Sequence, residues 1–223
     1  MRRFGMRSIA IVAALFVVGA GEKEQHVIWE LDNLEEIGGH KVTVVGDPKV
    51  IDTPHGKAIE FDGVDDGIFF DVHPLAGMET FTVEVIFQPY KDGLAEQRFF
   101  HMQEHGTTER VMFETRLTEE DDLWYLDTFM QTGGQNNTML AIGDKHELGP
   151  WYHAAIVVDG TTFKHYVNGR MELGKEVVFT PQKPGETSMG VRLNKVYWYK
   201  GAIRKARFTP RPLKPAEFLT AED

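Results

Sequence analysis

The chain has 223 residues, with 24 Lys and Arg against 34 Asp and Glu, which gives a formal net charge of −10. This acidic surplus repels a nucleic-acid backbone over most of the surface, so nucleic acid is not expected as a partner. The chain contains no cysteine, which excludes disulfides, thiolate metal sites and a cysteine nucleophile. The length fits one domain that is large enough to bury its own core.

The N-terminus has the pattern of a secretory signal. The basic stretch RRFGMR (2–7) precedes the apolar run IAIVAALFVV (9–18), and this run is too short to span a bilayer as a helix. We therefore predict a signal peptide over 1–20, cleaved after Ala20, and a single mature domain over 21–223 without a membrane span. The alternative is an N-terminal helix packed on the core. Export of an acidic chain without cysteine favours a secreted or periplasmic location in a bacterial envelope.

The rest of the chain breaks into short alternating runs separated by turn residues such as Asp-Gly, Gly-Gly and Asn-Gly pairs. No helical pattern interrupts these runs, so they predict an all-β antiparallel sandwich or barrel. Only the C-terminal stretch LKPAEFLTAED is expected to form a helical turn. The predicted strands are 26–31, 41–46, 57–61, 67–72, 81–89, 98–104, 110–117, 123–131, 138–143, 151–160, 162–169, 188–193 and 200–210.

Three stretches carry a resemblance to a known family. They are FDGVDD (61–66), WYHAAIVVDGTTFKHYVNG (151–169) and KGAIRKARFTPRPLKPAEF (200–218). Their sequences, order and spacing resemble the signature blocks of the laminin-G-like branch of the concanavalin A-like lectin/glucanase superfamily. The resemblance covers nearly the whole mature chain. It implies a jelly-roll sandwich of two curved antiparallel sheets, with a concave face where relatives bind or cut sugars.

The acidic turn in the first of these blocks is a candidate calcium site. Asp62, Asp65 and Asp66 offer carboxylate oxygens, and calcium takes six to eight oxygen ligands. Many relatives carry an Asp-Glu pair after the isoleucine of the last strand, where this chain has Arg204 and Lys205. This departure weakens a calcium site carried over from the family. Two alternatives stay open, a structural calcium ion at the three aspartates or a solvated acidic turn.

Four middle strands suggest a second site. Alternation places apolar residues of each strand on one face and polar residues on the other, so the polar faces of neighbouring strands would form one stripe on the concave side of the jelly roll. Trp124 or Tyr125 at the edge of this stripe would stack on a sugar ring. The alternative is a solvated sheet face with cross-strand pairs. The expected carbohydrate-binding residues are Glu84, His101, Gln103, Glu114, Arg116, Trp124, Asp127 and Gln131.

Three hypotheses for function follow. The leading one is an exported, non-catalytic domain that binds carbohydrate or another extracellular glycan. The second is a glycoside hydrolase or polysaccharide lyase acting on an extracellular polysaccharide, with Glu84, His101, Glu114 and Asp127 as its acids and bases. The third is an adhesion or assembly module of the cell envelope, which predicts an exposed apolar patch.

Two further patterns in the sequence are weaker. The stretch ELDNLEE (30–36) resembles the signature of family 16 glycoside hydrolases, with Glu30 and Glu35 as the carboxylates, but it lies on an expected edge strand at the start of the mature domain. Nine histidines are present without the spacing of a zinc site. His153 and His165 are expected to be cross-strand neighbours in one hairpin.

Overall fold

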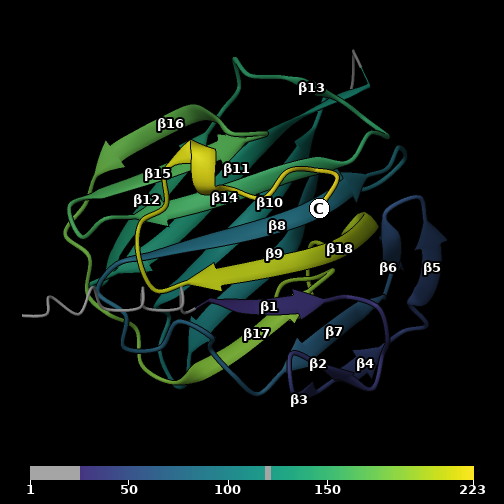
Figure 1. Cartoon of the computed structure of the whole chain (residues 1–223), viewed down its shortest axis with the longest axis horizontal. Coiled ribbons are helices and arrows are strands. Elements are labelled where there is room, and N and C mark those ends of the chain that lie inside the picture. Colours follow the sequence, from purple (N-terminus) through teal and green to yellow (C-terminus); the bar gives the residue numbers. More distant parts are fainter. Residues whose placement is uncertain (1–25, 119–121) are drawn as a thin grey trace, which may run out of the picture.

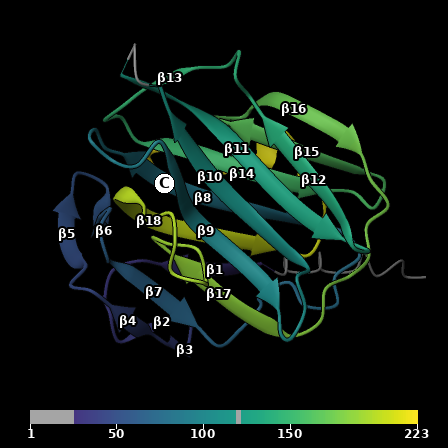
Figure 2. The ribbon, with the colours of Figure 1, turned by 180° about the vertical axis from the view of Figure 1, so that it is seen from behind.

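The computed structural model of the chain describes residues 26–118 and 122–223. The predicted signal peptide lies outside these residues. Within the two described ranges, no helix is long and apolar enough to cross a membrane. The described part folds into two large antiparallel sheets that face each other, one seen from its outer side in Figure 1 and the other in Figure 2.

The first sheet, here called the β14 sheet, contains eight strands. In spatial order they are β16 (Arg170–Glu176), β15 (Thr162–Val167), β14 (Tyr152–Val158), β8 (Phe81–Pro89), β18 (Lys200–Thr209), β6 (Gly56–Asp62) and β5 (Lys49–Thr53), with β1 (Val27–Glu30) beside β18.

The second sheet, here called the β10 sheet, also contains eight strands. In spatial order they are β12 (Gln135–Leu140), β11 (Leu123–Thr132), β10 (Arg110–Leu117), β9 (Glu96–Glu104), β17 (Gly185–Met189), β7 (Gly67–Phe70) and β4 (Thr43–Val45), with β13 (His146–Glu147) beside β11. A short hairpin of β2 (Glu36–Ile37) and β3 (His40–Lys41) stands apart from both sheets. The predicted antiparallel sandwich is confirmed.

The core lies between the two sheets and is rich in aromatic side chains. Phe87 of β8 stacks on Phe99 of β9 with 4.2 Å between ring centroids, which joins the two sheets directly. Trp29 of β1 packs on Phe70 of β7, with ring centroids 4.4 Å apart. This contact joins the two sheets at a second point. Burying such a side chain contributes about 1.5 to 3 kcal/mol, so these contacts hold the sheets together without disulfides.

Strand β14 is buried along its whole length, as its apolar sequence predicts. One face contacts the core, and the other lies under the C-terminal segment, where Phe218 packs against Ala155, Val157 and Tyr166. This segment contains the one-turn 3₁₀ helix η1 (Pro215–Glu217), where the sequence predicts a helical turn, and it crosses the outer face of the β14 sheet (Figure 1).

The edges of the sandwich are less predictable than its centre. The sequence does not predict the edge strands β5 and β16, because most of their side chains are at least partly exposed on both faces and show no alternation. The prediction for the hairpin histidines is also wrong. His165 points into the core and lies 2.8 Å from the hydroxyl of Thr128, whereas His153 points outward and contacts Glu84.

Candidate functional site

The outer face of the β10 sheet carries most of the predicted polar stripe. Strand register aligns Arg98, Glu114 and Asp127 across β9, β10 and β11, and it aligns a second polar row further along the same strands. Residues two apart on a strand share a face, and a register shift between Phe113 and Glu114 brings Arg98 onto the face of Gln103. Both rows therefore belong to the outer face of the sheet that Figure 2 shows from outside. The predicted residues on this face are His101, Gln103, Glu114, Arg116, Asp127 and Gln131.

A charged cluster of three acids and two arginines lies at the centre of this face. Arg98 Nη2 donates to Glu114 Oε2 at 2.8 Å, and Arg116 Nη2 lies 2.7 Å from Asp127 Oδ2 and 3.4 Å from Glu114 Oε2. Both arginines also pair with Glu96. Each guanidinium therefore bridges two or three carboxyl groups, and this network fixes both arginine side chains in place.

Burial gives the cluster an unusual protonation state. Glu114 and Asp127 are only 2% and 1% exposed. Burial, reinforced by the neighbouring Asp127, raises the pKa of Glu114 to about 8, although Arg98 and Arg116 oppose this change. Glu114 therefore carries a proton at neutral pH, and the two arginines balance the two remaining carboxylates.

The groups that a ligand can reach on this face are amides, guanidinium groups, rings and the carboxylate of Glu96, whose side chain is 41% exposed. The carboxyl groups of Glu114 and Asp127 are covered, so they orient the arginines and do not present an open carboxylate pair. The half-buried side chains that reach the surface of this face are Glu96, Gln103, Arg110, Arg116, Tyr125, Phe129 and Gln131.

The loop 190–199 between β17 and β18 borders this face, and the sequence did not point to it. The ring of Tyr197 lies 3.8 Å from the Arg98 guanidinium and is 39% exposed. Its φ of 62° is a left-handed conformation that is rare for a bulky residue. Two backbone contacts hold the loop, because Arg98 N–H donates to Tyr197 O at 2.9 Å and Leu193 N–H donates to His101 Nδ1 at 3.0 Å.

Trp124 does not belong to the site, which corrects the prediction. Its side chain is 0% exposed and lies in the core, where the indole N–H donates to Glu147 O at 3.2 Å and the ring packs edge-on against Tyr152. Trp124 is two residues from Leu126, which is also 0% exposed and in the core, so both side chains share the inner face. Tyr125 is the aromatic residue of this pair that faces outward.

Glu84 is also wrongly placed in the predicted stripe. Strand β8 belongs to the β14 sheet, because it pairs with β14 and β18 and not with β9. Glu84 Oε1 accepts from Leu219 N–H at 2.8 Å and lies 3.0 Å from His153 Nε2, while Oε2 accepts from Arg207. Burial alone would raise the pKa of Glu84, but these contacts from His153 and Arg207 outweigh burial and lower it. Glu84 therefore anchors the C-terminal segment.

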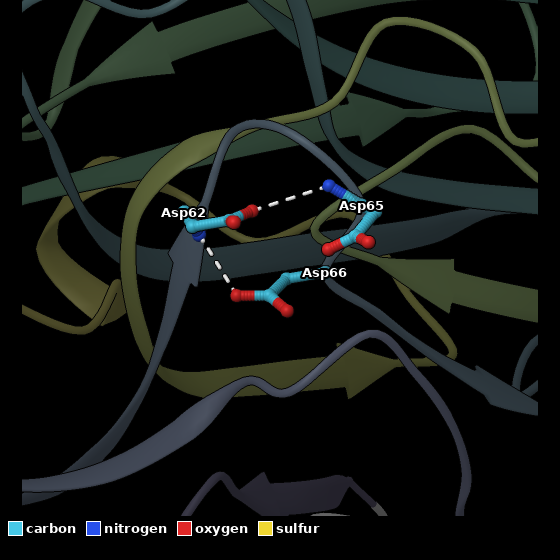
Figure 3. A group of neighbouring side chains, drawn as sticks. All are labelled: Asp62, Asp65 and Asp66. Atoms are coloured by element: carbon cyan, nitrogen blue, oxygen red, sulfur yellow. Dashed lines mark hydrogen bonds between the residues drawn. The ribbon is translucent and has the colours of Figure 1, made fainter.

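The three aspartates of the acidic turn come together as predicted (Figure 3). Their carboxylate oxygens lie within 4.8 Å of one another. Asp66 accepts hydrogen bonds from Asp47 N–H at 2.6 Å and Asp62 N–H at 3.0 Å, and Asp62 Oδ1 accepts from Val64 N–H at 2.8 Å. The turn lines a pocket of about 560 Å³.

The donor set of this turn fits a hydrated calcium ion. Among the described residues, none donates a hydrogen bond to the carboxylate of Asp65, which faces the same space as those of Asp62 and Asp66. Three carboxylates supply part of a calcium shell of six to eight oxygens, and water would have to supply much of the rest. Arg204 and Lys205 contribute nothing here, because they hold the C-terminal segment through the carbonyls of Ala221 and Asp223.

The weaker glycosidase pattern is not assembled. Glu30 lies on β1 and pairs with Lys205 at 3.2 Å, in the β14 sheet. Asn33 and Glu35 form a turn in which the Asn33 side chain accepts from Glu35 N–H at 2.9 Å. These residues therefore do not reach the outer face of the β10 sheet.

Comparison with known proteins agrees with this architecture. A family model described as the concanavalin A-like lectin/glucanases superfamily, Laminin_G_3, matches residues 62–218. No curated protein matches the chain in sequence.

Solved structures of low sequence identity share the fold. Domain 4 of a GH43 extracellular arabinanase from Geobacillus stearothermophilus, in complex with arabinotriose, is 19% identical with a TM-score of 0.64, over 86% of this chain and 94% of that chain. A sialidase of Trypanosoma rangeli in complex with the inhibitor DANA is 12% identical with a TM-score of 0.62, over 85% of this chain and 31% of that chain. The binding domain of botulinum neurotoxin DC in complex with SialylT is 10% identical with a TM-score of 0.61, over 86% and 49%.

Proposed function

Because this chain belongs to the concanavalin A-like lectin/glucanases superfamily, we propose that it is an exported, non-catalytic domain that binds an extracellular glycan. The binding site is the outer face of the β10 sheet. The observation that carries this proposal is the exposed ring of Tyr197, stacked on Arg98 beside a row of half-buried polar side chains. The sugar complexes of the arabinanase domain and the neurotoxin domain support it by analogy of fold.

The chemistry of this face suits a sugar. Sugar hydroxyls need hydrogen-bond donors and acceptors, which Gln103, Arg116 and Gln131 supply from half-buried positions. Arg116 is already held by Glu96 and Asp127, so binding costs little side-chain entropy. One side of the Tyr197 ring packs on Arg98, which leaves its exposed part to stack on the apolar face of a sugar ring.

The covered acids argue for binding without catalysis. A retaining glycosidase needs two carboxyl groups about 5 to 5.5 Å apart that both reach the scissile bond. Glu114 and Asp127 are neighbours, but they are buried beneath the arginines, and Glu84 lies on the other sheet. These positions favour a binding module over a hydrolase or lyase. The two most exposed large apolar side chains of the described residues, Val64 and Val178, lie beside different strands, which does not favour an assembly module.

A glycan array followed by affinity electrophoresis tests the proposal. We expect wild type to bind at least one class of oligosaccharide and the variants Tyr197→Ala and Arg116→Ala to bind it about tenfold more weakly, which corresponds to about 1.4 kcal/mol. Trp151→Ala is the matched control, because Trp151 is a half-buried aromatic residue near Arg204 at the other sheet. Wild type that binds no glycan, or two site variants that bind as wild type does, would refute the proposal.

We also propose that Asp62, Asp65 and Asp66 bind a calcium ion with a structural role. The convergence of their carboxylates supports this role, and the hydrogen bonds from Asp47, Asp62 and Val64 would keep the turn folded when the ion is absent. Calcium would therefore raise the thermal stability of the domain modestly without being required for folding.

A further inference from the structure

Two arginines stand out on the outer face of the β10 sheet because they lack acidic partners. Neither Arg110 nor Arg192 forms an ion pair with a carboxylate of the described residues. Within the described ranges, Arg110 donates only to neutral oxygens, to Thr108 O at 2.7 Å and to the side chain of Gln131. The other arginines of this face, Arg98 and Arg116, each contact at least two carboxyl groups.

The loop that carries Arg192 lies beside Arg110, because Leu193 N–H donates to His101 Nδ1 on β9 at 3.0 Å and Gln103 of the same strand pairs with Arg110. Burial, followed by the nearby charge of Arg192, lowers the pKa of Arg110, and Glu114 and Glu109 only partly offset this effect. The carboxylate of Glu109 is turned toward the backbone N–H of Gly134, which donates to it at 2.9 Å. In a chain with 34 acidic and 24 basic residues, two neighbouring arginines that form no ion pair with a described carboxylate are unexpected.

The surroundings of the pair are rich in donors. His101 is buried beside both arginines, and burial followed by the charges of Arg192 and Arg110 keeps its pKa well below the ordinary value. Its Nδ1 accepts from Leu193 N–H, so the proton of the neutral ring is on Nε2. The Gln131 side-chain oxygen accepts from Arg110, which leaves the amide nitrogen as a further donor.

The position of the pair fits one end of an extended ligand. The Arg110 guanidinium lies 4.4 Å from the ring centroid of Phe129 and is thereby held against the sheet. Arg110 and Glu114 are four residues apart on β10, a separation of about 13 Å along a strand. An oligosaccharide bound beside Tyr197 and the charged cluster would have to extend along the strands to reach Arg110.

We infer that Arg110 and Arg192 form a subsite for an anionic group of the bound glycan, either the carboxylate of an acidic sugar or a sulfate ester. Guanidinium groups bind both kinds of anion through paired hydrogen bonds, and they stay charged at any physiological pH. The inference rests on the proposed glycan binding and adds the class of ligand. An acidic glycan would supply the direct ion-pair partner that no described side chain supplies to these two arginines.

Calorimetric titration of the full chain with matched oligosaccharides tests the inference. Trigalacturonate is compared with neutral galactotriose, and a chondroitin sulfate hexasaccharide with its desulfated form. We expect wild type to prefer at least one charged member over its counterpart by about tenfold or more, with a preference that shrinks at high salt. The pair that shows the preference distinguishes a carboxylate from a sulfate.

The variants separate the arginine pair from the rest of the face. In Arg110→Gln/Arg192→Gln we expect the two members of each pair to bind with equal affinity. In Arg192→Gln alone we expect a partial loss of the preference. The single variant guards against unfolding because Arg192 lies on a loop. Arg170→Gln, an exposed arginine of the β14 sheet, should keep the preference. Equal binding of the two members in both pairs by wild type, or a preference retained in the double variant, overturns the subsite and leaves glycan binding intact. Failure of every sugar to bind overturns both.

Discussion

Replacing Glu114 with glutamine tests whether the charged cluster holds a proton at neutral pH. The glutamine side chain is uncharged and has nearly the shape of a protonated glutamate, so it mimics the state that burial favours. Wild-type Glu114 has a pKa raised by burial from 4.5 to about 8. The folded state therefore binds this proton more tightly than the unfolded chain does.

The magnitude follows from the two pKa values. The stability that this group contributes is fully present below about pH 4.5 and is lost as the pH rises through about 8. One pKa unit corresponds to about 1.4 kcal/mol, so full ionisation of Glu114 would reduce the free energy of unfolding by about 5 kcal/mol. Any movement of Arg98 or Arg116 toward the ionised carboxylate would lower that cost.

Urea denaturation at about pH 5, 7 and 9 measures this effect. At pH 5 we expect wild type and Glu114→Gln to have similar free energies of unfolding, and at pH 9 we expect the variant to be more stable by several kcal/mol. Other titrating groups, such as His101 and His165, are common to both proteins and cancel in the difference. A difference between the two proteins that stays constant from pH 5 to 9 would refute the reasoning.

Glu96→Gln is the matched control, because the pKa of Glu96 is shifted in the opposite direction to that of Glu114. Burial alone would raise the pKa of Glu96, but its contacts with Arg98 and Arg116 outweigh burial and lower it. Its contribution to stability is therefore present above the unfolded pKa and is lost as the pH falls. We expect Glu96→Gln to destabilise the fold at pH 7 and 9 alike, without the gain at high pH that Glu114→Gln shows.

Three further results are expected. Trp124→Ala should lower the free energy of unfolding by about 3 to 5 kcal/mol in urea denaturation while leaving glycan affinity at low temperature unchanged, and a selective loss of affinity would contradict its place in the core. Arg207→Ala should cost about 3 to 5 kcal/mol because it leaves the buried Glu84 carboxylate poorly compensated, and a loss below 1 kcal/mol would be inconsistent with that anchor. Calcium should raise the melting temperature of wild type over a chelator control but not that of Asp65→Asn, and identical responses would exclude the proposed ion.

The fold was predictable because its signals are local. Alternating runs and turn pairs mark the central strands, and the apolar faces of Tyr152–Val158 mark a strand that is covered on both sides. The edge strands β5 and β16 were not predicted, because few of their side chains are buried and their sequences show no alternation. Alternation of apolar and polar residues therefore predicts the interior strands of a sheet better than its edge strands.

The site was only partly predictable, because alternation assigns a face within one strand and does not say to which sheet the strand belongs. Glu84 obeys the alternation of β8, yet β8 pairs with strands of the β14 sheet. Tyr197 was missed for a different reason. It lies in a loop, and its partner Arg98 is distant from it in the sequence, so no local pattern connects the two residues. The acidic turn was found because all of its ligands lie within five residues of sequence.

The two outer faces of the sandwich have different uses, and this difference supports the assignment of the ligand site. Arg204, Lys205 and Arg207 each donate to a backbone carbonyl of the C-terminal segment, so this basic stretch of β18 holds the segment over the β14 sheet. Phe218 then covers the apolar residues of that sheet. Since the chain itself occupies this face, a glycan displacing the segment would have to uncover the buried Glu84. The β10 sheet presents half-buried arginine, amide and aromatic groups without that cost, which makes it the face on which binding is expected.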